Sequence, residues 1–231
     1  MPKLILVDDS VVIPGMVSVV FPSRGRSDTL LPKAFNTLQE LADNPDLVEY
    51  GVAHDPDDPD TGDVARSYGA WVYVSPTRLG WAGNKTYFAK LFERSVGEWM
   101  VPWGDDGLML TPGWDTLIRN SPRGVLHLQG GVAGHNVFPA VHRDVLKAIG
   151  EHCPSPHQDT WLTEVAEEAG VLHSVDIRIL EDRFDVTGNN RDKTWEEGSI
   201  HAYRSSEYYT PVMAAHRSRH AVKVREALDV P

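Results

Sequence analysis

The chain has little cysteine, no long apolar run and no excess of basic charge, and each absence excludes a class of protein. The single cysteine, Cys153, excludes an intramolecular disulfide, so we expect a reducing, cytoplasmic setting. No run of about 18 apolar residues is present, which predicts no membrane span and no membrane partner. The first nine residues lack the pattern of a secretory signal.

Charge is unevenly distributed along the chain. The net charge of −11 argues against a basic surface that covers the whole molecule, and so against tight nucleic-acid binding through one. The stretch from His216 to Arg225 is basic. It predicts a solvated helix face or, less favoured, a local cationic surface for phosphates or an acidic partner.

Two common phosphate-binding motifs are also missing. The first predicted strand is followed by Pro-Ser-Arg-Gly-Arg at positions 22–26. This loop matches neither the Gly-x-Gly-x-x-Gly fingerprint of dinucleotide-binding proteins nor the Walker loop. A nucleotide bound here would depend on an acidic loop for its base and ribose, and on a metal for its diphosphate.

The first half of the chain alternates apolar runs with amphipathic stretches. Strands are expected at 16–21, 48–53, 71–74 and 98–103, with helices between them. This alternation predicts an α/β fold with a Rossmann-type, mostly parallel sheet flanked by helices. The second half is less regular. There we expect a strand at 125–129, helices at 143–149 and 160–169, a late strand at 175–180, a loop at 185–195 and a helical tail.

Four loops should meet at one edge of this sheet. In open α/β sheets, ligands bind beyond the carboxyl ends of the strands. The loops at 22–26, 54–63, 78–84 and 104–107 each follow a predicted strand. We therefore expect them to converge on one crevice.

Asp105 and Asp106 stand at the end of the fourth predicted strand, directly before Gly107. Two adjacent carboxylates at the end of a buried strand are costly unless a cation lies between them. Their oxygens suit Mg²⁺ or Mn²⁺, which would share its other positions with water and a substrate diphosphate. The alternative is an exposed Asp-Asp-Gly turn. The converging loops favour the metal site.

The order of these parts resembles a known family. Pro-Ser-Arg-Gly-Arg at 22–26, Asp55 after the second strand, a Gly-Asn loop before a helix, Gly-Asp-Asp at 104–106 and Thr-Pro-Gly-Trp-Asp at 111–115 follow one another. This order is similar to GT-A-fold glycosyltransferases of the family 2-like group, including compact bacteriophage-encoded members. The resemblance covers roughly residues 17–185. It implies one GT-A-like domain over 1–231, with a nucleotide-sugar-binding half at about 16–120 and an acceptor and catalytic half with a tail at about 121–231.

The resemblance also implies roles for individual residues. The donor is a nucleotide-diphospho-sugar, with a UDP-sugar favoured, and the cofactor is Mn²⁺ or Mg²⁺. Asp106 and Asp105 are the implied metal ligands. In place of the late His ligand of many relatives, either Asp182 or its neighbour Glu181 acts, or the metal is bound more weakly. Asp159 is the implied general base of an inverting reaction; its alternative is an ordinary helix N-cap. The nucleotide-sugar-binding candidates are Pro22, Ser23, Arg24, Arg26, Asp55, Arg78, Asn84, Lys85 and Asp105.

The acceptor side is less well defined. His135, Asn136 and Trp161 are candidate acceptor residues, because a glycine-rich turn brings backbone close to a ligand and Trp offers a flat stacking face. Trp161 is equally expected in the core. The acceptor favoured by the compact form is a hydroxymethylated pyrimidine in phage DNA, in the host cytoplasm, which an enzyme reaches in duplex only by extruding the base. A protein or glycan acceptor is the alternative.

Two other functions are less favoured by the sequence. A sugar-nucleotide nucleotidyltransferase would carry a glycine-rich first loop followed by Lys, and this chain does not. A non-catalytic nucleotide-sugar- or carbohydrate-binding protein would have no need for Asp55, Asp105, Asp106 and Asp159 together.

Overall fold

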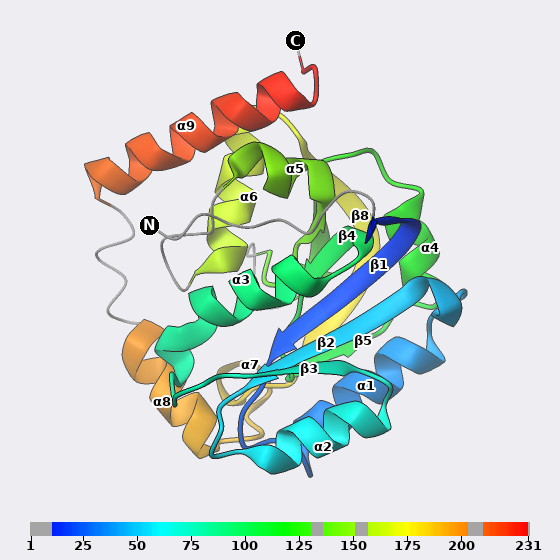
Figure 1. Ribbon diagram of the computed structural model, residues 1–231, viewed down its shortest axis with the longest axis vertical. Helices are drawn as coiled ribbons and strands as arrows, with labels where there is room; N and C mark the ends of the chain where they lie inside the picture. Colours follow the sequence, from blue (N-terminus) through cyan, green and yellow to red (C-terminus); the bar gives the residue numbers. More distant parts are fainter. Residues whose placement is uncertain (1–10, 131–135, 151–156, 203–209, 231) are drawn as a thin grey trace.

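One mixed sheet of eight strands runs through the described part of the chain, which comprises residues 11–130, 136–150, 157–202 and 210–230 (Figure 1). In this computed structural model the strand order is β3-β2-β1-β4-β7-β6-β8-β5. Strands β1 to β4 pair in parallel, as do β6 and β8, whereas β7 and β5 run antiparallel to their neighbours. The predicted α/β fold class is confirmed, and the two reversed strands make the sheet mixed. The strands are β1 (Ile13–Pro22), β2 (Val48–His54), β3 (Trp71–Val74), β4 (Gly97–Pro102), β5 (Gly107–Met109), β6 (Val125–Gly130), β7 (Ala140–His142) and β8 (Leu172–Glu181).

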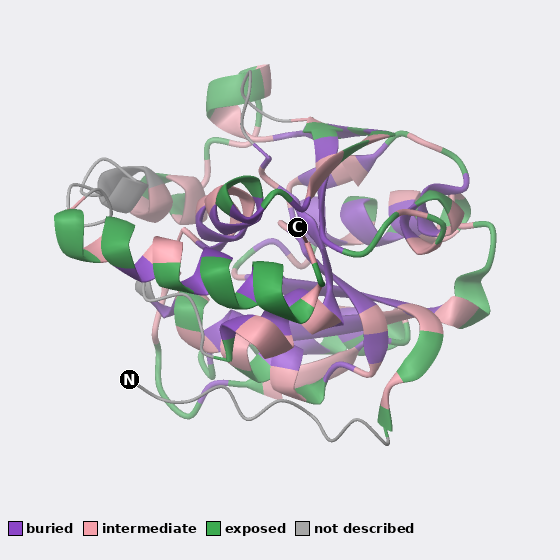
Figure 2. Ribbon diagram, turned by 90° about the horizontal axis from the view of Figure 1, so that it is seen from above, coloured by how far each residue is buried: buried purple, intermediate pink, exposed green. Residues whose placement is uncertain are grey.

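Helices cover both faces of the sheet. Helices α1, α2 and α4 pack on one face, and α3, α5 and α6 pack on the other, where α9 lies across α5 and α6. In Figure 2 the sheet is buried, while the helices carry their exposed residues outward. The helices are α1 (Leu30–Glu40), α2 (Pro59–Ser67), α3 (Asn84–Arg94), α4 (Trp114–Arg119), α5 (Arg143–Ile149), α6 (Gln158–Ala169), α7 (Phe184–Thr187), α8 (Lys193–Ala202) and α9 (Pro211–Ala227), with short 3-10 turns η2 (Pro45–Leu47) and η3 (Trp81–Gly83).

Strand β1 is buried on both faces, as its β-branched run predicts. Val17, Val19 and Phe21 point into the core beneath α1, and Val20 points into the core beneath α3. This alternation follows from the two-residue period of a strand. Full burial of each such side chain contributes about 1.5–3 kcal/mol. The central strand is therefore a rigid support for the loop that follows it.

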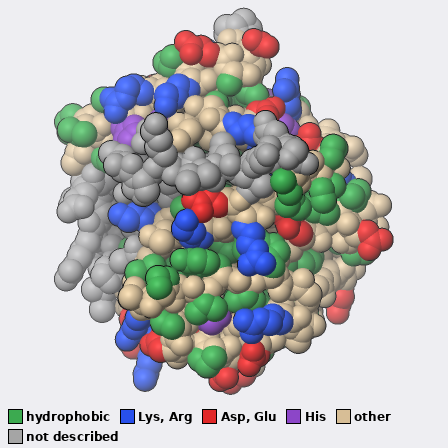
Figure 3. Space-filling view, viewed as in Figure 1, with side chains coloured by type: hydrophobic (Ala, Val, Ile, Leu, Met, Phe, Trp, Pro, Cys, Tyr) green, Lys and Arg blue, Asp and Glu red, His purple; other side chains and the backbone are tan. Residues whose placement is uncertain are grey.

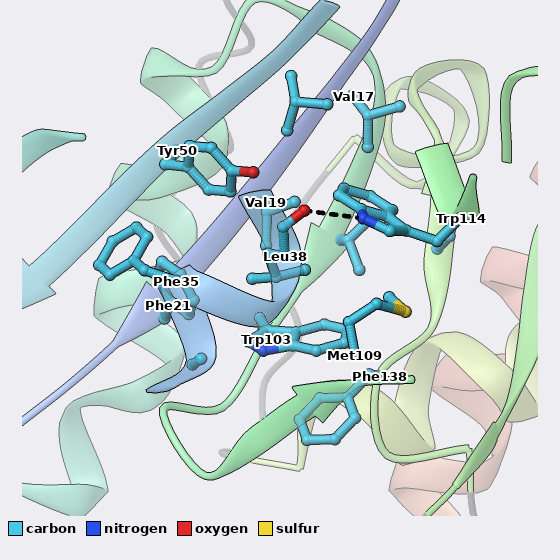
Figure 4. Packing of buried hydrophobic residues seen from close by; sticks show 14 of the residues in the cluster. Val17, Val19, Phe21, Phe35, Leu38, Tyr50, Trp103, Met109, Trp114 and Phe138 are labelled. Atoms are coloured by element: carbon cyan, nitrogen blue, oxygen red, sulfur yellow. Dashed lines mark hydrogen bonds between the residues drawn. The ribbon is translucent and has the colours of Figure 1, made fainter. Parts of the chain in front are cut away.

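The Thr-Pro-Gly-Trp-Asp stretch at 111–115 stabilises the packing of α1. Trp114 donates a 3.0 Å hydrogen bond from Nε1 to the carbonyl of Leu38, inside the aromatic core (Figure 4). Asp115 accepts hydrogen bonds from the backbone N–H groups of Asp43 (2.8 Å) and Asn44 (2.9 Å). These hydrogen bonds of Trp114 and Asp115 hold the end of α1 against α4.

Some elements differ from the prediction. Helix α2 begins at Pro59, inside the acidic stretch expected to be a loop, because Pro suits the first helical turn. Residues 185–195, also expected as a loop, contain most of α7 and the start of α8. The short elements β5, α4 and β7 were not predicted. They depend on partners far away in the sequence, such as β8 for β5, and so leave little local pattern.

Candidate active site

A cavity of about 360 Å³ opens at the carboxyl ends of β1, β2 and β4. Each of the four loops predicted to meet there contributes to its lining, so the predicted convergence is confirmed. The start of α6 and part of α8 complete the wall from the second half of the chain. Nine of the predicted site residues line the cavity: Pro22, Ser23, Arg24, Arg26, Asp55, Asn84, Asp105, Asp106 and Asp159.

A guanidinium group lies between the two aspartates. Arg26 Nη1 contacts Asp105 Oδ1 at 2.5 Å and Asp106 Oδ2 at 3.4 Å. Ser23 donates a 2.6 Å hydrogen bond from Oγ to the other oxygen of Asp105. The Arg26 side chain is only 5% exposed. The cation expected between these carboxylates is therefore provided here by the chain itself.

The carboxylate of Asp106 lies farther from the Arg26 guanidinium than that of Asp105 does. Burial and the charge of Asp105 together raise the pKa of Asp106 to about 6, against the opposing effects of Arg26 and Arg183. A closer or more highly charged cation would favour the ionised form. The pair is thus suited to bind a divalent ion.

Glu181, the last residue of β8, lies next to the aspartate pair because β8 pairs with β5. It pairs in register with Gly107, and the N–H of Asp182 donates a 2.7 Å hydrogen bond to the carbonyl of Asp106. Glu181 Oε1 accepts a 2.6 Å bond from Arg183. Burial raises the pKa of Glu181 to about 7, opposed by Arg183 and reinforced by the charge of Asp106.

Two buried oxygens on the cavity wall have no hydrogen-bond donor within the described residues. One is Oε2 of Glu181, a residue that is 2% exposed. The other is Oε1 of Gln158, a residue that is 3% exposed. Buried polar atoms are nearly always paired in folded proteins. These two acceptors are therefore available to a ligand that carries hydroxyl groups or a cation.

Asp55 organises the loop that follows β3. Its Oδ1 accepts from the N–H of Leu79 (2.7 Å) and from the hydroxyl of Tyr87. Its Oδ2 accepts from the N–H of Gly80 and from Arg24, both at 3.1 Å. The carboxylate is buried, and these bonds hold the loop against the end of β1 and the start of α3. The role predicted for it toward a base or ribose stays a prediction.

Helix α8 forms one wall of the cavity, through Thr194, Trp195, Glu197 and Gly198. Arg26 binds Asp192 with two hydrogen bonds, from Nε (2.8 Å) and Nη2 (3.2 Å). Thr194 Oγ1 donates a 2.8 Å bond to the carbonyl of Arg24. The sequence does not predict this wall, because its mixed polar and aromatic residues lack the apolar spacing of an amphipathic helix.

Asp159 stands in the first turn of α6 and lines the cavity. Its neighbour His157 makes an edge-on ring contact with Trp81, with centroids 5.7 Å apart, across the cavity wall. Asp159 is therefore on the same cavity as Asp106, as a base acting on a bound acceptor requires. Its role as that base stays a prediction.

Two of the predicted acceptor residues, Asn136 and Trp161, do not line the cavity. Asn136 is buried and bonds the backbone of β6, donating to Leu126 O (3.1 Å) and accepting from Leu128 N (3.3 Å). Trp161 is 1% exposed and donates from Nε1 to His220 on α9 at 3.2 Å. Both residues serve packing, which corrects the expectation that they face an acceptor. His135 lies outside the described residues.

Three other predicted residues also lie off the cavity. Lys85 is exposed on the first turn of α3. Arg78 pairs at 2.9 Å with Glu197 on α8, which lines the cavity. Asp182 accepts a 3.0 Å bond from Thr187, while its neighbour Glu181 lines the cavity. Strand β8 ends at Glu181, so Asp182 is the first residue of the connection that follows it.

The basic stretch on α9 is largely used within the fold. Arg225 donates to the carbonyls of Glu168 (2.8 Å) and Ala169 (3.5 Å), at the end of α6. Lys223 donates to Ile149 O at 3.2 Å, at the end of α5. Cations at helix C-termini satisfy carbonyls that lack an intrahelical partner. In Figure 3, Lys and Arg side chains are interspersed with acidic and apolar ones, without a continuous basic patch on the visible described surface.

The aspartate pair fits a divalent ion in ligand type and direction. Two carboxylate oxygens converge on one cationic nitrogen of Arg26, so they already point toward a common positive charge. Within the described residues no group of three His, Cys, Asp or Glu side chains is arranged to hold a metal alone. An ion here would need oxygens from a bound diphosphate or water, as Mg²⁺ sites commonly have.

Comparison with solved structures identifies the fold. The chain matches a mannosyltransferase from Pyrobaculum calidifontis in complex with GDP-Man and Mn²⁺ (TM-score 0.61, 14% identity, 99% of this chain and 76% of that chain). It matches S. aureus TarS 1-349 in complex with UDP (TM-score 0.57, 12% identity, 93% and 90%). It also matches glucosyl-3-phosphoglycerate synthase from Mycobacterium tuberculosis in complex with Mn²⁺ and UDP-glucose (TM-score 0.57, 15% identity, 84% and 78%). The fold is that of GT-A glycosyltransferases, as the sequence motifs imply.

The likeness is structural rather than one of sequence. No protein-family model and no curated protein matches the sequence. Within the described residues, no helix combines the length and apolar character needed to cross a bilayer.

Proposed function

We propose that this protein is a metal-dependent glycosyltransferase that moves a sugar from a nucleotide-diphospho-sugar to a hydroxyl acceptor. The observation that carries this proposal is the position of the aspartate pair. Asp105 and Asp106 converge on one cationic point in the cavity floor, at the carboxyl edge of a GT-A sheet. In such sheets that edge is where ligands bind.

Asp105 and Asp106 would hold the ion, which we propose is Mn²⁺ or Mg²⁺. When bound, the ion supplies positive charge that neutralises the leaving nucleoside diphosphate. Ser23 holds Asp105 in place through its 2.6 Å hydrogen bond. The donor proposed first is a UDP-sugar, and GDP-mannose is the alternative, since the similar structures include complexes with both kinds of nucleotide.

Asp159 is the proposed general base. A carboxylate that faces the sugar can take the proton of an acceptor hydroxyl, which contributes about 10²–10⁴ in rate. The unpaired oxygens of Gln158 and Glu181 line the same cavity and support an acceptor or sugar rich in hydroxyl groups.

The acceptor proposed first is a hydroxymethylated pyrimidine, with a glycan or protein hydroxyl as the alternative. The basic side chains Lys223 and Arg225 are bound to helix ends rather than presented together to a duplex. This favours a free nucleotide or a single strand over double-stranded DNA as the form to test.

A thermal-shift panel of nucleotide-sugars, each with Mn²⁺ and with a chelator, tests the proposal. A rise in melting temperature that needs both one donor and Mn²⁺ supports it and names the donor. A shift with a donor but no turnover with any acceptor would favour the non-catalytic binding protein. No shift with any donor would remove the proposal.

A further inference from the structure

The side chain of Arg26 has a position that donor binding alone does not explain. It is 5% exposed and donates hydrogen bonds to three carboxylates of this chain, those of Asp105, Asp106 and Asp192. These three anions raise the pKa of Arg26 even though its burial acts in the opposite direction. The guanidinium is therefore a permanent cation in this cluster.

A divalent ion and Arg26 would need the same carboxylate oxygens. Nη1 of Arg26 lies 2.5 Å from Asp105 Oδ1, whereas a Mg²⁺ or Mn²⁺ ion binds oxygen at about 2.0–2.2 Å and excludes another cation from between its ligands. The two cations cannot occupy that point together. We propose that Arg26 is a built-in competitor for the metal, so that its side chain must leave the aspartate pair before the ion is bound. This inference rests on the proposed function, because it concerns the metal of that same site.

The same side chain connects the metal position with the cavity wall. Nε and Nη2 of Arg26 bind Asp192, which also accepts a 2.7 Å bond from the N–H of Trp195 at the start of α8. When Arg26 leaves the aspartate pair, its contact with Asp192 must shift or break. Binding at two linked positions is reciprocal. Weakening the contact between Arg26 and Asp192 should therefore make the metal bind more tightly.

The test uses Mn²⁺ alone and Mn²⁺ with UDP, with bound Mn²⁺ measured by electron paramagnetic resonance on the full chain. Arg26→Gln removes the competitor. Asp192→Asn weakens its anchor, and Asn retains the ability to cap α8. Arg66→Gln is the charge-matched control, because it also removes one positive charge. Arg66 is exposed on α2, where it pairs with Asp63 at 2.9 Å, and it does not line the cavity.

We expect Arg26→Gln to tighten Mn²⁺ binding by at least about fivefold, the lower end of typical coupling between linked positions. We expect Asp192→Asn to tighten it by less, and Arg66→Gln to leave it close to the native value. If Arg26→Gln fails to fold, the direction of the Asp192→Asn change decides the proposal.

Two contrary results are distinguishable. Unchanged or weaker Mn²⁺ binding in both variants, with Mn²⁺ still bound by the native chain in the presence of UDP, would overturn the competition and leave the proposed function intact. Arg26 would then contact the diphosphate beside the ion. Absence of Mn²⁺ binding in every variant, with and without UDP, would overturn the proposed function as well.

Discussion

The hydroxyl of Ser23 donates a 2.6 Å hydrogen bond to Oδ2 of Asp105, which joins the end of β1 to the end of β4 at the floor of the cavity. Both residues are buried. The bond orients one oxygen of the Asp105 carboxylate, while the other oxygen contacts Arg26. Removing this bond therefore tests the metal site without replacing either aspartate.

Replacing Ser23 with Ala should weaken the affinity for UDP in the presence of Mn²⁺ by about tenfold, because a hydrogen bond to a charged group contributes about 1.5 kcal/mol or more. Isothermal titration calorimetry measures this. Ser67→Ala is the control, since Ser67 lies on α2 and donates a hydrogen bond to the backbone of its own helix. Equal affinity in native protein and Ser23→Ala would show that Asp105 needs no orientation by Ser23.

Replacing Asp106 with Asn should abolish the Mn²⁺-dependent part of UDP binding. The amide keeps the shape of the side chain but removes the negative charge that a divalent ion requires. Titration with and without a chelator separates the two parts. Asp63→Asn is the matched control, because Asp63 is exposed on α2 and pairs with Arg66. Retained metal dependence in Asp106→Asn would remove this residue from the metal site.

Replacing Asp159 with Asn should leave donor affinity unchanged and lower the rate of transfer by about 10²–10⁴, the usual contribution of a general base. Steady-state kinetics with a saturating donor measures the rate. Glu167→Gln, an exposed position on the same helix, is the control. A transfer rate near the native value in Asp159→Asn would assign the base to another residue.

The lowered pKa of Asp115 predicts that folding stability depends on pH. Burial disfavours its ionised form, but the side chain of Arg119 and the N–H groups of Asp43 and Asn44 together outweigh burial and lower the pKa of Asp115. A depressed carboxyl pKa contributes stability above the pKa of the unfolded chain, and that stability is lost as the pH falls through the folded value.

We therefore expect Asp115→Asn to lower the free energy of unfolding at pH 7 by about 1.5–3 kcal/mol, the usual contribution of hydrogen bonds to a charged group. Urea unfolding at pH 7 and below pH 4 measures this. The difference between native protein and variant should narrow at the lower pH. A difference that stays constant with pH would mean that Asp115 acts through packing alone.

Arg225 should matter for stability rather than for nucleic acid. Replacing Arg225 with Ala removes the donor to two carbonyls at the end of α6 and should lower stability by about 0.5–1.5 kcal/mol, the usual net contribution of such a bond. Arg219→Ala, an exposed position on the same helix, is the charge-matched control. A variant with native stability but a weaker affinity for single-stranded DNA would reverse this assignment and restore the cationic surface as a binding surface.

The parts of this protein that the sequence predicts are those with a local pattern. The apolar run at 16–21 is a strand because a β-branched stretch of that length needs burial on both faces, and the loop after it lies at the site because parallel strands end at one edge. Asp105 and Asp106 could be recognised as a pair, because adjacent carboxylates at a strand end are unusual.

The parts that escaped prediction depend on contacts distant in sequence. Arg26 and Asp192 are 166 positions apart, so nothing near either residue indicates their pairing. Asn136 and Trp161 have side chains typical of ligand sites, yet they satisfy the backbone of β6 and the ring of His220. The choice of Glu181 over Asp182 on the cavity wall depends on the register between β8 and β5, which the sequence does not show.

The most direct test of the central claim is the release of nucleoside diphosphate from the donor that the native chain binds, followed with Mn²⁺, with a chelator and in Asp106→Asn. The account predicts slow release with Mn²⁺ in the native chain, faster release once an acceptor hydroxyl is present, and loss of release with the chelator or in Asp106→Asn. Release at the same rate in Asp106→Asn, or no release from any UDP- or GDP-sugar with Mn²⁺, would contradict it.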